Sequence, residues 1–248
     1  MINRDLHVHT TYSDGKSTPE EVVLSAIKKG LSILGFSDHS YTAFDEKYCI
    51  KKEKISDYIS EISALKEKYK TQIEILCGIE QDYFSGNPEF EFDFIIGSVH
   101  YFKLGNEYIP VDSNADILIG AAEKYFGGDI YSLCEEYFSL VGEVADKTNA
   151  TIIGHFDLIT KFNEKTPIID PCNPRYIAAW QKAADKLLCK NIPFEINTGA
   201  ISRGYRTTPY PASDILNYIK AKGGKFILSS DSHRADTLAF NFEKFNTL

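Results

Sequence analysis

Short apolar runs alternate with amphipathic segments along nearly the whole chain. Seven of these runs are rich in Ile, Phe and Val and show little alternation of polar and apolar residues, which is typical of strands buried on both faces. The predicted strands are Arg4–His9, Ile33–His39, Glu74–Glu80, Phe92–His100, Thr151–His155, Pro193–Asn197 and Lys225–Asp231.

Most segments between these runs repeat apolar residues at helical spacing. Thr18 followed by Pro19 and Glu21 is typical of a helix start, and Gly30 and Gly223 lie where helices commonly end. The predicted helices run from Thr18 to about Lys29, and over Ile55–Lys70, Tyr131–Lys147, Pro174–Lys190 and Ala212–Lys222. Alternating strands and helices predict an α/β protein with a parallel sheet.

The length agrees with this pattern, because 248 residues is the usual size of one α/β barrel. We therefore expect residues 1–248 to form a single domain, a parallel β/α barrel of the TIM type. An open doubly wound sheet is the alternative.

Charge and cysteine content narrow the function classes. The net charge of −8 disfavours an extended nucleic-acid partner, whose binding surface is normally basic. The five cysteines are scattered without a CxxC pair, which fits neither a disulfide framework nor a zinc ribbon. The opening MINRDLHVHT is too polar for a signal peptide, and no segment is apolar for long enough to span a bilayer. These features predict a protein of the reducing cytoplasm with no membrane partner, and they give no indication of its oligomeric state.

All six histidines fall at or just past the carboxyl end of a predicted strand. They are His7, His9, His39, His100, His155 and His233. Glu80 ends the third predicted strand, and Asp231 ends the seventh. The carboxyl ends of parallel strands form one rim of a barrel, where active sites lie. We therefore expect these side chains to gather in one place.

The spacing of these residues suits metal binding. His7 and His9, like Asp231 and His233, are two positions apart and can point to the same side of a strand. Asp14 follows the first pair within DLHVHTTYSDG. Imidazole and carboxylate donors without thiolates suit zinc, manganese or iron. Any one such side chain is more often an ordinary hydrogen-bonded or solvated residue, but nine together predict a site for two or three divalent cations.

Six motifs occur in order over nearly the whole chain. They are HVHTTYSDG from residue 7, SDH at 37–39, GIE at 78–80, GSVH at 97–100, GHFD at 154–157 and SDSH at 230–233. In this order they resemble the motifs of the polymerase-and-histidinol-phosphatase (PHP) superfamily. The segments FDFIIGSVHYF and EINTGAISRGYRTTPYPASDIL are similar to its histidinol-phosphate phosphatase branch.

The resemblance implies a distorted seven-stranded β/α barrel with a cluster of three metal ions. The implied ligands are His7, His9, Glu80 and Asp231 for one ion, Asp14, His39 and His233 for a second, and His100 and His155 with a bridging Glu80 for the third. Many members of the superfamily carry histidine where this chain has Asp14. The implied reaction is hydrolysis of a phosphate monoester by a metal-bridging hydroxide. Glu80, Asp231 and His233 are the candidate catalytic residues.

Positively charged side chains near the same rim are candidates for binding the substrate phosphate. Arg203 and Arg206 lie in a polar, glycine-bearing loop after the sixth predicted strand. Arginine's planar fork matches phosphate geometry in a way that lysine's point charge does not. Lys161, six residues after His155, is a further candidate.

One further segment and two aspartates are assigned roles by their position in the sequence. The stretch Tyr101–Asn114 follows His100 and is predicted to cover the pocket as a lid. Asp38 and Asp157, which lie close to ligand histidines in sequence, are candidates to orient them. Both are equally well interpreted as ordinary turn or cap residues.

The preferred interpretation is a metal-dependent phosphomonoesterase acting on L-histidinol phosphate in histidine biosynthesis. A nuclease, or a phosphoesterase for nucleotides or another small phosphate ester, is the alternative within the superfamily. An amidohydrolase also begins with HxH on a barrel strand, but its metals are typically bridged by a strand-end lysine, and no predicted strand ends in lysine. A metal-binding sensor would take up metal without turnover.

Overall fold

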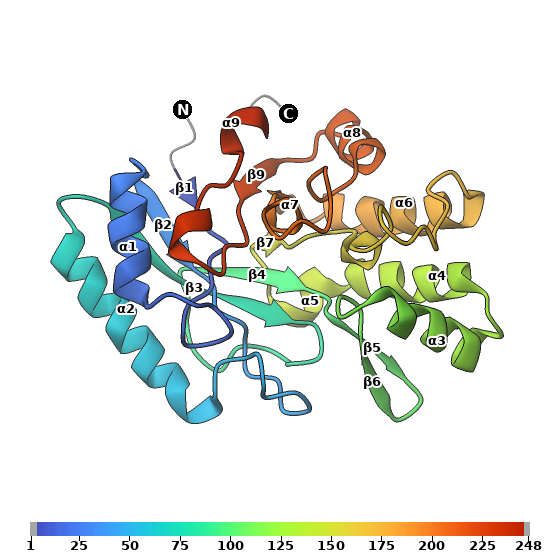
Figure 1. Ribbon diagram of the computed structural model, residues 1–248, viewed down its shortest axis with the longest axis horizontal. Helices are drawn as coiled ribbons and strands as arrows, with labels where there is room; N and C mark the ends of the chain where they lie inside the picture. The colour runs from blue at the N-terminus through green and yellow to red at the C-terminus, as the bar shows by residue number, and fades with distance from the viewer. Residues whose placement is uncertain (1–3, 246–248) are drawn as a thin grey trace.

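The computed structural model describes residues 4–245, which contain the predicted barrel. Seven parallel strands form one sheet in chain order, without the reversal of a doubly wound sheet, and helices lie around its outside (Figure 1). The strands are β1 (Arg4–Asp5), β2 (Ile33–Phe36), β3 (Glu74–Asp82), β4 (Phe94–Ser98), β7 (Ile152–Ile153), β8 (Phe194–Asn197) and β9 (Phe226–Ser229). All seven predicted strands are present, most of them shorter than the apolar run that predicts them.

The barrel closes at the carboxyl end of its first and last strands. There, just past β1 and β9, Val8 pairs with Ser232 in a parallel bridge. The His9 N–H donates to the Ser232 carbonyl at 2.8 Å, and the Ser232 N–H donates to the His7 carbonyl at 3.1 Å. This closure fixes the first predicted ligand motif beside the last one, at the rim where the sequence predicts that they meet.

A buried aspartate supports the closure one layer below the rim. Asp5, at the end of β1, is fully buried. Its carboxylate accepts hydrogen bonds from the backbone N–H of Ser230 at 3.1 Å, from the Ser230 hydroxyl at 2.5 Å and from the N–H of Ala239 at 2.8 Å. Burial raises the pKa of Asp5, and these hydrogen bonds oppose that rise. An apolar residue would leave all three donors unpaired.

Four of the five predicted helices are present with small differences at their ends. The helices are α1 (Pro19–Lys28), α2 (Ile55–Tyr69), α3 (Ala115–Phe126), α4 (Ile130–Val141), α5 (Val144–Thr148), α6 (Pro174–Leu188), α7 (Gly199–Ser202), α8 (Ser213–Ala221) and α9 (Phe242–Phe245), with 3₁₀ turns at Lys52–Lys54, Leu158–Thr160 and Ala235–Thr237. The capping box is confirmed, since Thr18 accepts from the Glu21 N–H and Glu21 accepts from the Thr18 N–H. Within residues 4–245, no helix is long and apolar enough to cross a membrane.

Two helical features depart from the prediction. Helix α3 is absent from the predicted set, as are the four-residue helices α7 and α9. Asn114 caps the start of α3, and Gly127, with φ of 60°, ends it. The predicted helix Tyr131–Lys147 is instead two helices, α4 and α5, interrupted after Val141. At that break Gly142 lies against α6, where a Cβ atom would come within 3.3 Å of the Ala183 Cα. The close approach of α6 therefore favours glycine at the point where the helix stops.

The predicted lid is a β-hairpin that is packed into the fold. Strands β5 (Tyr101–Leu104) and β6 (Glu107–Pro110) pair antiparallel outside the barrel sheet. Phe102 is fully buried in the same apolar cluster as α3 and α4 residues. The hairpin is therefore anchored to the fold through Phe102, and two of its residues, Tyr101 and Pro110, line the cavity described below.

A small apolar cluster fills the barrel beneath the rim. It consists of Leu6, Phe94, Ile96, Ile152 and Ile227, with Ile33 and Leu76 packed against it. Positions 76, 78 and 80 of β3 point to the same side of the sheet, so Glu80 stands directly above this cluster. Gly78 leaves space for the Phe94 ring, which a Cβ atom at that position would meet. The barrel therefore has an apolar floor and a polar rim.

We expect Asp5→Asn to lower the free energy of unfolding by about 1.5–3 kcal/mol, because the amide can no longer accept from all three donors and the lost bonds involve a charged group. The measurement is chemical denaturation. The matched control is Asp236→Asn: Asp236 pairs with Arg234 on the surface, and exposed pairs contribute less than about 1 kcal/mol. Equal losses of unfolding free energy in the two variants would show that Asp5 does not stabilise the barrel closure.

Candidate metal centre

Glu80 lies at the centre of the rim, surrounded by five of the six histidines. Its carboxylate belongs to a fully buried residue on β3. Oε2 lies 2.7 Å from His39 Nδ1, 3.4 Å from His7 Nε2 and 3.6 Å from His9 Nε2. Oε1 lies 3.0 Å from His155 Nε2 and 3.3 Å from His100 Nε2. Each of these histidines comes from a different strand end, except for the pair that follows β1.

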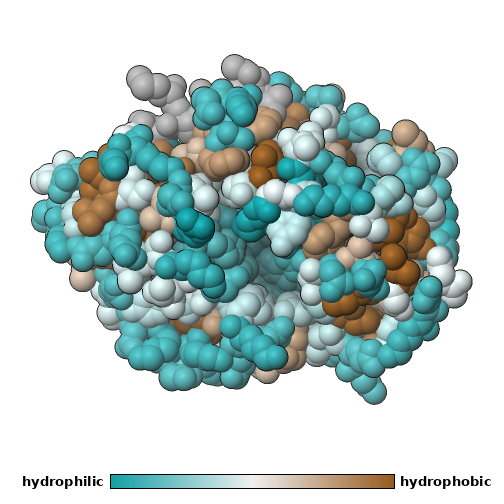
Figure 2. Space-filling view, viewed as in Figure 1, coloured by the Kyte–Doolittle hydropathy of each residue, from teal (hydrophilic) through white to brown (hydrophobic). Residues whose placement is uncertain are grey.

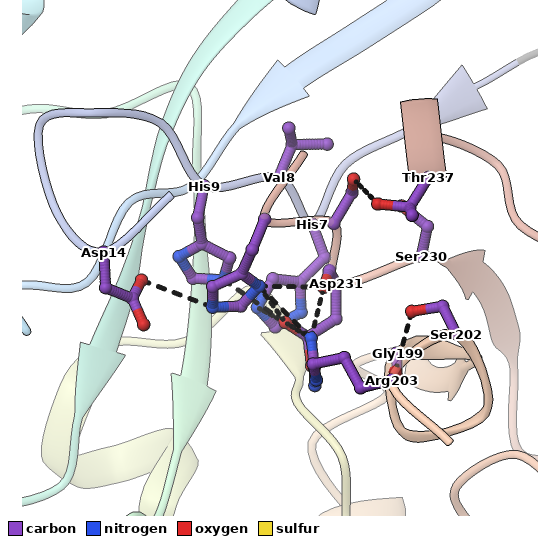
Figure 3. Close-up of polar contacts among 12 residues, drawn as sticks. His7, Val8, His9, Asp14, Gly199, Ser202, Arg203, Ser230, Asp231 and Thr237 are labelled. Carbon is purple, nitrogen blue, oxygen red and sulfur yellow. Dashed lines mark hydrogen bonds and ion pairs between the residues drawn. The ribbon is translucent and has the colours of Figure 1, made fainter. Parts of the chain in front are cut away.

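The remaining predicted ligands complete the cluster on one side. Asp14 Oδ1 lies 3.3 Å from His233 Nε2 and 3.6 Å from His39 Nε2. Asp231 Oδ1 lies 3.4 Å from His9 Nε2 and 3.5 Å from His233 Nδ1. Figure 3 shows the N-terminal motif and Asp231 facing one another. The structure thus brings all nine predicted ligands together.

The loop after His9 returns Asp14 to the cluster. Asp38 accepts hydrogen bonds from the N–H and hydroxyl of Thr10 and from the hydroxyl of Ser13, at 2.6–2.9 Å. At Gly15 a Cβ atom would lie 2.6 Å from the carbonyl carbon and oxygen of His9. The glycine therefore permits the loop to close tightly on the strand end. The prediction that Asp38 orients a histidine is replaced by a different role, which is to hold this loop.

The donor atoms fit divalent cations. Within residues 4–245, six buried donor atoms of the cluster make no hydrogen bond: His7 Nε2, His9 Nδ1, His9 Nε2, Asp14 Oδ1, Glu80 Oε2 and His100 Nδ1. Buried polar atoms without partners cost free energy, which a bound cation would offset. Three groups have donor atoms within 4.8 Å of one another: His9, Asp14, His39 and His233; His7, His9 and Glu80; and His39, Glu80 and His100.

Mutual electrostatic interactions shift the pKa values of the carboxylates and imidazoles in the cluster. Burial opposes charge on Glu80, yet His7 and other histidines around it hold the pKa of Glu80 well below its usual value. Burial likewise opposes charge on Asp231, and Arg203 and His7 hold its pKa well below the usual range. Burial and two neighbouring histidines lower the pKa of His9 well below its usual value. Burial also opposes charge on His7, His39 and His100, yet buried carboxylates beside them raise the pKa of all three rings. Because a ligating imidazole is neutral, cation binding would release protons from these rings.

Two carboxylates that sequence reasoning missed lie beside the ligand histidines. Glu195, fully buried on β8, accepts from His7 Nδ1–H at 2.6 Å and from the backbone N–H of His155 at 3.0 Å. This contact leaves His7 Nε2 facing the cluster. Asp82 lies 3.3 Å from His100 Nδ1 and accepts from the His100 backbone N–H at 3.0 Å. In the sequence, both residues could have been noticed as carboxylates on strands, β8 and β3, that do not end in a histidine.

A cavity of about 370 Å³ opens above the cluster. Figure 2 shows this face hollowed near its centre, with hydrophilic residues around the hollow. Lys161 and Arg203 both line it. Lys161 Nζ donates to the Asp112 carboxylate at 2.9 Å, and Arg203 donates to the Asp231 carboxylate at 2.9 Å and to its carbonyl at 2.7 Å. At Gly199 a side chain would collide with this arginine–aspartate pair.

Arg206 does not reach the cavity. Its side chain is buried, with Nη1 donating to the Thr160 hydroxyl at 2.6 Å and lying 3.5 Å from the Asp157 carboxylate. The guanidinium stacks 4.3 Å from the centre of the Tyr210 ring. Among the described residues, Arg206 therefore links the loop after β8 to the loop after β7, and Asp157 contributes to this link. Within residues 4–245, the Asp157 carboxylate accepts from Thr160, Arg206 and Ala212 and from no histidine, so its predicted orienting role lacks a direct contact.

The hairpin and the loop after β2 form the remaining walls. Tyr101, Pro110, Asp112 and Ser113 line the cavity from the hairpin segment. Asp45 and Tyr48 line it from the other loop. The Tyr48 ring lies edge-on to the His39 ring at 4.9 Å. The walls formed by the hairpin and by the loop after β2 thus present aromatic and acidic side chains to the cavity.

Comparison with known proteins agrees with this architecture. The PHP domain model matches residues 5–199. A protein of Deinococcus radiodurans named "Probable histidinol-phosphatase" is 29% identical, over 96% of this chain and 89% of its own length.

Two solved structures share the fold. The candidate histidinol phosphatase hisK from Listeria monocytogenes has a TM-score of 0.83 at 17% identity, covering 98% of this chain and 99% of that one. The histidinol phosphate phosphatase of Lactococcus lactis, solved with zinc, L-histidinol and phosphate, has a TM-score of 0.73 at 23% identity, covering 99% and 91%.

The central position of Glu80 leads to a prediction about metal content. We expect the purified protein to carry at least about two divalent ions per chain. Glu80→Gln should lose more metal than Asp14→Asn, because Glu80 contacts five histidines whereas Asp14 contacts two at the edge. Elemental analysis of the folded variants measures this. Equal and mild losses would contradict the central role of Glu80.

The contact between Glu195 and His7 leads to a second prediction. Glu195→Ala should weaken metal binding by roughly 10- to 100-fold, since partners that orient a ligand histidine have effects of this size. Glu195→Gln should have a smaller effect, because its amide oxygen still accepts from His7 Nδ1–H. Competition with a metal-binding dye reports the affinity directly. An unchanged affinity in the alanine variant would show that His7 is oriented without Glu195.

Proposed function

This chain belongs to the PHP domain family, and from that premise we propose that it is a metal-dependent phosphomonoesterase. Its proposed reaction converts L-histidinol phosphate and water into L-histidinol and phosphate, a step of histidine biosynthesis. The observation that carries the proposal is the cavity lined by seven of the nine candidate metal ligands and by two basic side chains, those of Lys161 and Arg203.

The substrate is supported by the relatives. The Deinococcus radiodurans protein bears the name of this activity and aligns with 96% of the chain. The Lactococcus lactis structure holds both products of the proposed reaction together with zinc. The motifs extend from residue 7 to residue 233, so we propose residues 1–248 as one phosphoesterase domain.

We assign the donors to three cations as the motifs imply. The proposed sets are His7, His9, Glu80 and Asp231; Asp14, His39 and His233; and His100 and His155 with Glu80 shared. When bound, divalent cations lower the pKa of a water molecule and neutralise phosphate oxygens. Zinc, manganese and iron suit this donor set.

The chain's own residues bind and place the ester. Arg203 reaches the cavity beside Asp231 and His233, and Lys161 reaches it from the loop after β7. Charge-assisted hydrogen bonds from these two side chains would hold the phosphate over the cluster. Arg206 has no part in this step, because it lies outside the cavity lining.

The first test of the function is phosphate release. We expect the metal-loaded protein to release phosphate from L-histidinol phosphate, and chelation followed by removal of the chelator to abolish the activity until metal is restored. A panel with nucleoside monophosphates and single-stranded oligonucleotides tests the alternative activities. Faster turnover of a nucleotide than of L-histidinol phosphate would favour the alternative.

The position of Arg203 gives a further prediction. Arg203→Ala should lower kcat/KM for L-histidinol phosphate by roughly 10- to 150-fold, because hydrogen bonds to charged groups contribute about 1.5–3 kcal/mol and about 1.4 kcal/mol is tenfold. Arg203→Lys should recover part of the loss, since it restores charge without the fork.

Metal content measured on the same samples separates two roles of Arg203. Retained metal with reduced kcat/KM indicates phosphate binding. Loss of metal in proportion to activity would show that Arg203 acts only through Asp231. Near-parental kcat/KM would contradict both roles.

A further inference from the structure

One carboxylate in the cavity is not matched by a positive charge. The lining contains five carboxylates, from Asp14, Asp45, Glu80, Asp112 and Asp231. Four of them lie within 4 Å of an imidazole, lysine or arginine nitrogen. Within residues 4–245, no ion pair includes Asp45. Its carboxylate accepts only from the Tyr101 hydroxyl at 2.9 Å and, weakly, from the Lys47 N–H at 3.4 Å.

The surrounding loop holds Asp45 in place. Phe44 stacks on Tyr108 of the hairpin, with ring centres 3.7 Å apart and planes 4° from parallel. The Asp45 N–H donates to the Thr42 carbonyl at 3.0 Å. The carboxylate is therefore presented to the cavity by a loop packed on the hairpin wall, with the Tyr101 hydroxyl fixing one of its oxygens.

The chemistry of the cavity is divided between its walls. The positively charged side chains of Lys161 and Arg203 belong to the loops after β7 and β8, whereas Asp45 belongs to the loop after β2. A carboxylate without a cation repels a phosphate, so it is unfavourable in a site that binds only the phosphate end of a ligand. It becomes favourable when the ligand carries a positive charge away from the phosphate. Tyr48 and Tyr101, beside Asp45, present aromatic rings that also attract cations.

We propose that Asp45 binds a protonated nitrogen in the alcohol part of the substrate, and thereby makes the site selective for phosphate esters of nitrogen-bearing alcohols. The proposal rests on the proposed phosphomonoesterase function and specifies its substrate class. L-histidinol phosphate has two such nitrogens, the ammonium group and the imidazole ring. Either satisfies the same chemistry, and the experiment distinguishes them.

The experiment compares four phosphate esters in the parent and in Asp45→Asn. L-histidinol phosphate carries both groups, 3-(imidazol-4-yl)propyl phosphate only the ring, 2-aminoethyl phosphate only the ammonium, and propyl phosphate neither. For each nitrogen-bearing ester the quantity measured is its kcat/KM divided by that of propyl phosphate. An inactive fraction of the protein lowers both values equally and therefore cancels from this ratio. Glu46→Gln, a change at the exposed neighbouring residue, is the matched control.

We expect Asp45→Asn to lower the ratio for L-histidinol phosphate by about tenfold or more, as loss of a charged hydrogen bond implies, and Glu46→Gln to leave it unchanged. A matching fall for 2-aminoethyl phosphate identifies the ammonium as the bound group, and a fall for the imidazolyl ester identifies the ring. Ratios that stay within about twofold of the parent would overturn the proposal.

A binding measurement keeps the proposal independent of turnover. Calorimetry with L-histidinol and with inorganic phosphate, on the metal-loaded protein, should show weaker L-histidinol binding in Asp45→Asn by about tenfold or more, with phosphate as the reference. Absence of L-histidinol binding in the parent, or equal affinity in both proteins, would refute the role of Asp45. Absence of hydrolysis of every ester, with normal L-histidinol binding, would instead refute the proposed function.

Discussion

The rest of the structure depends on the burial of one carboxylate among five imidazoles. Glu80 stands on the apolar floor of the barrel, and histidines from four strand ends converge on its two oxygens. Placing so many polar groups away from water is unfavourable unless each finds a partner. Several donor atoms find none within the described residues, so divalent cations would supply what the polypeptide leaves unsatisfied. Behind the rings, Glu195 accepts from His7 Nδ1–H and keeps His7 Nε2 turned toward that centre, and Asp82 lies 3.3 Å from His100 Nδ1.

This arrangement makes the site and the fold interdependent. A ligand that binds the folded state and not the unfolded chain stabilises the fold in proportion to its affinity and concentration. The cluster spans β1, β3 and the segment after β9, and it lies directly on the closure between Val8 and Ser232. Cations held there would therefore join the two ends of the sheet as well as serve the chemistry.

The sequence predicts the barrel and the gathering of the nine ligands because both follow from local patterns. Buried parallel strands leave continuous apolar runs, and their carboxyl ends share one rim, so residue position alone places His39 near His155. The direction in which a loop side chain points does not follow from such local patterns. Arg203 and Arg206 are three residues apart, but Gly204 between them has φ of 72°, and only one of the two side chains reaches the cavity. Glu195 was missed for a related reason, since its importance arises from a contact with His7 at the other end of the chain.

The closure of the barrel also has a consequence for how the protein is made. The first ligands follow β1, the next lie at the ends of β2 to β7, and the last lie just past β9. On the ribosome, the N-terminal histidines emerge long before Asp231 and His233 have been translated. A nascent chain therefore holds only part of the donor set. Cations that need donors from both ends of the chain would bind only after the last strand is free to pair with the first.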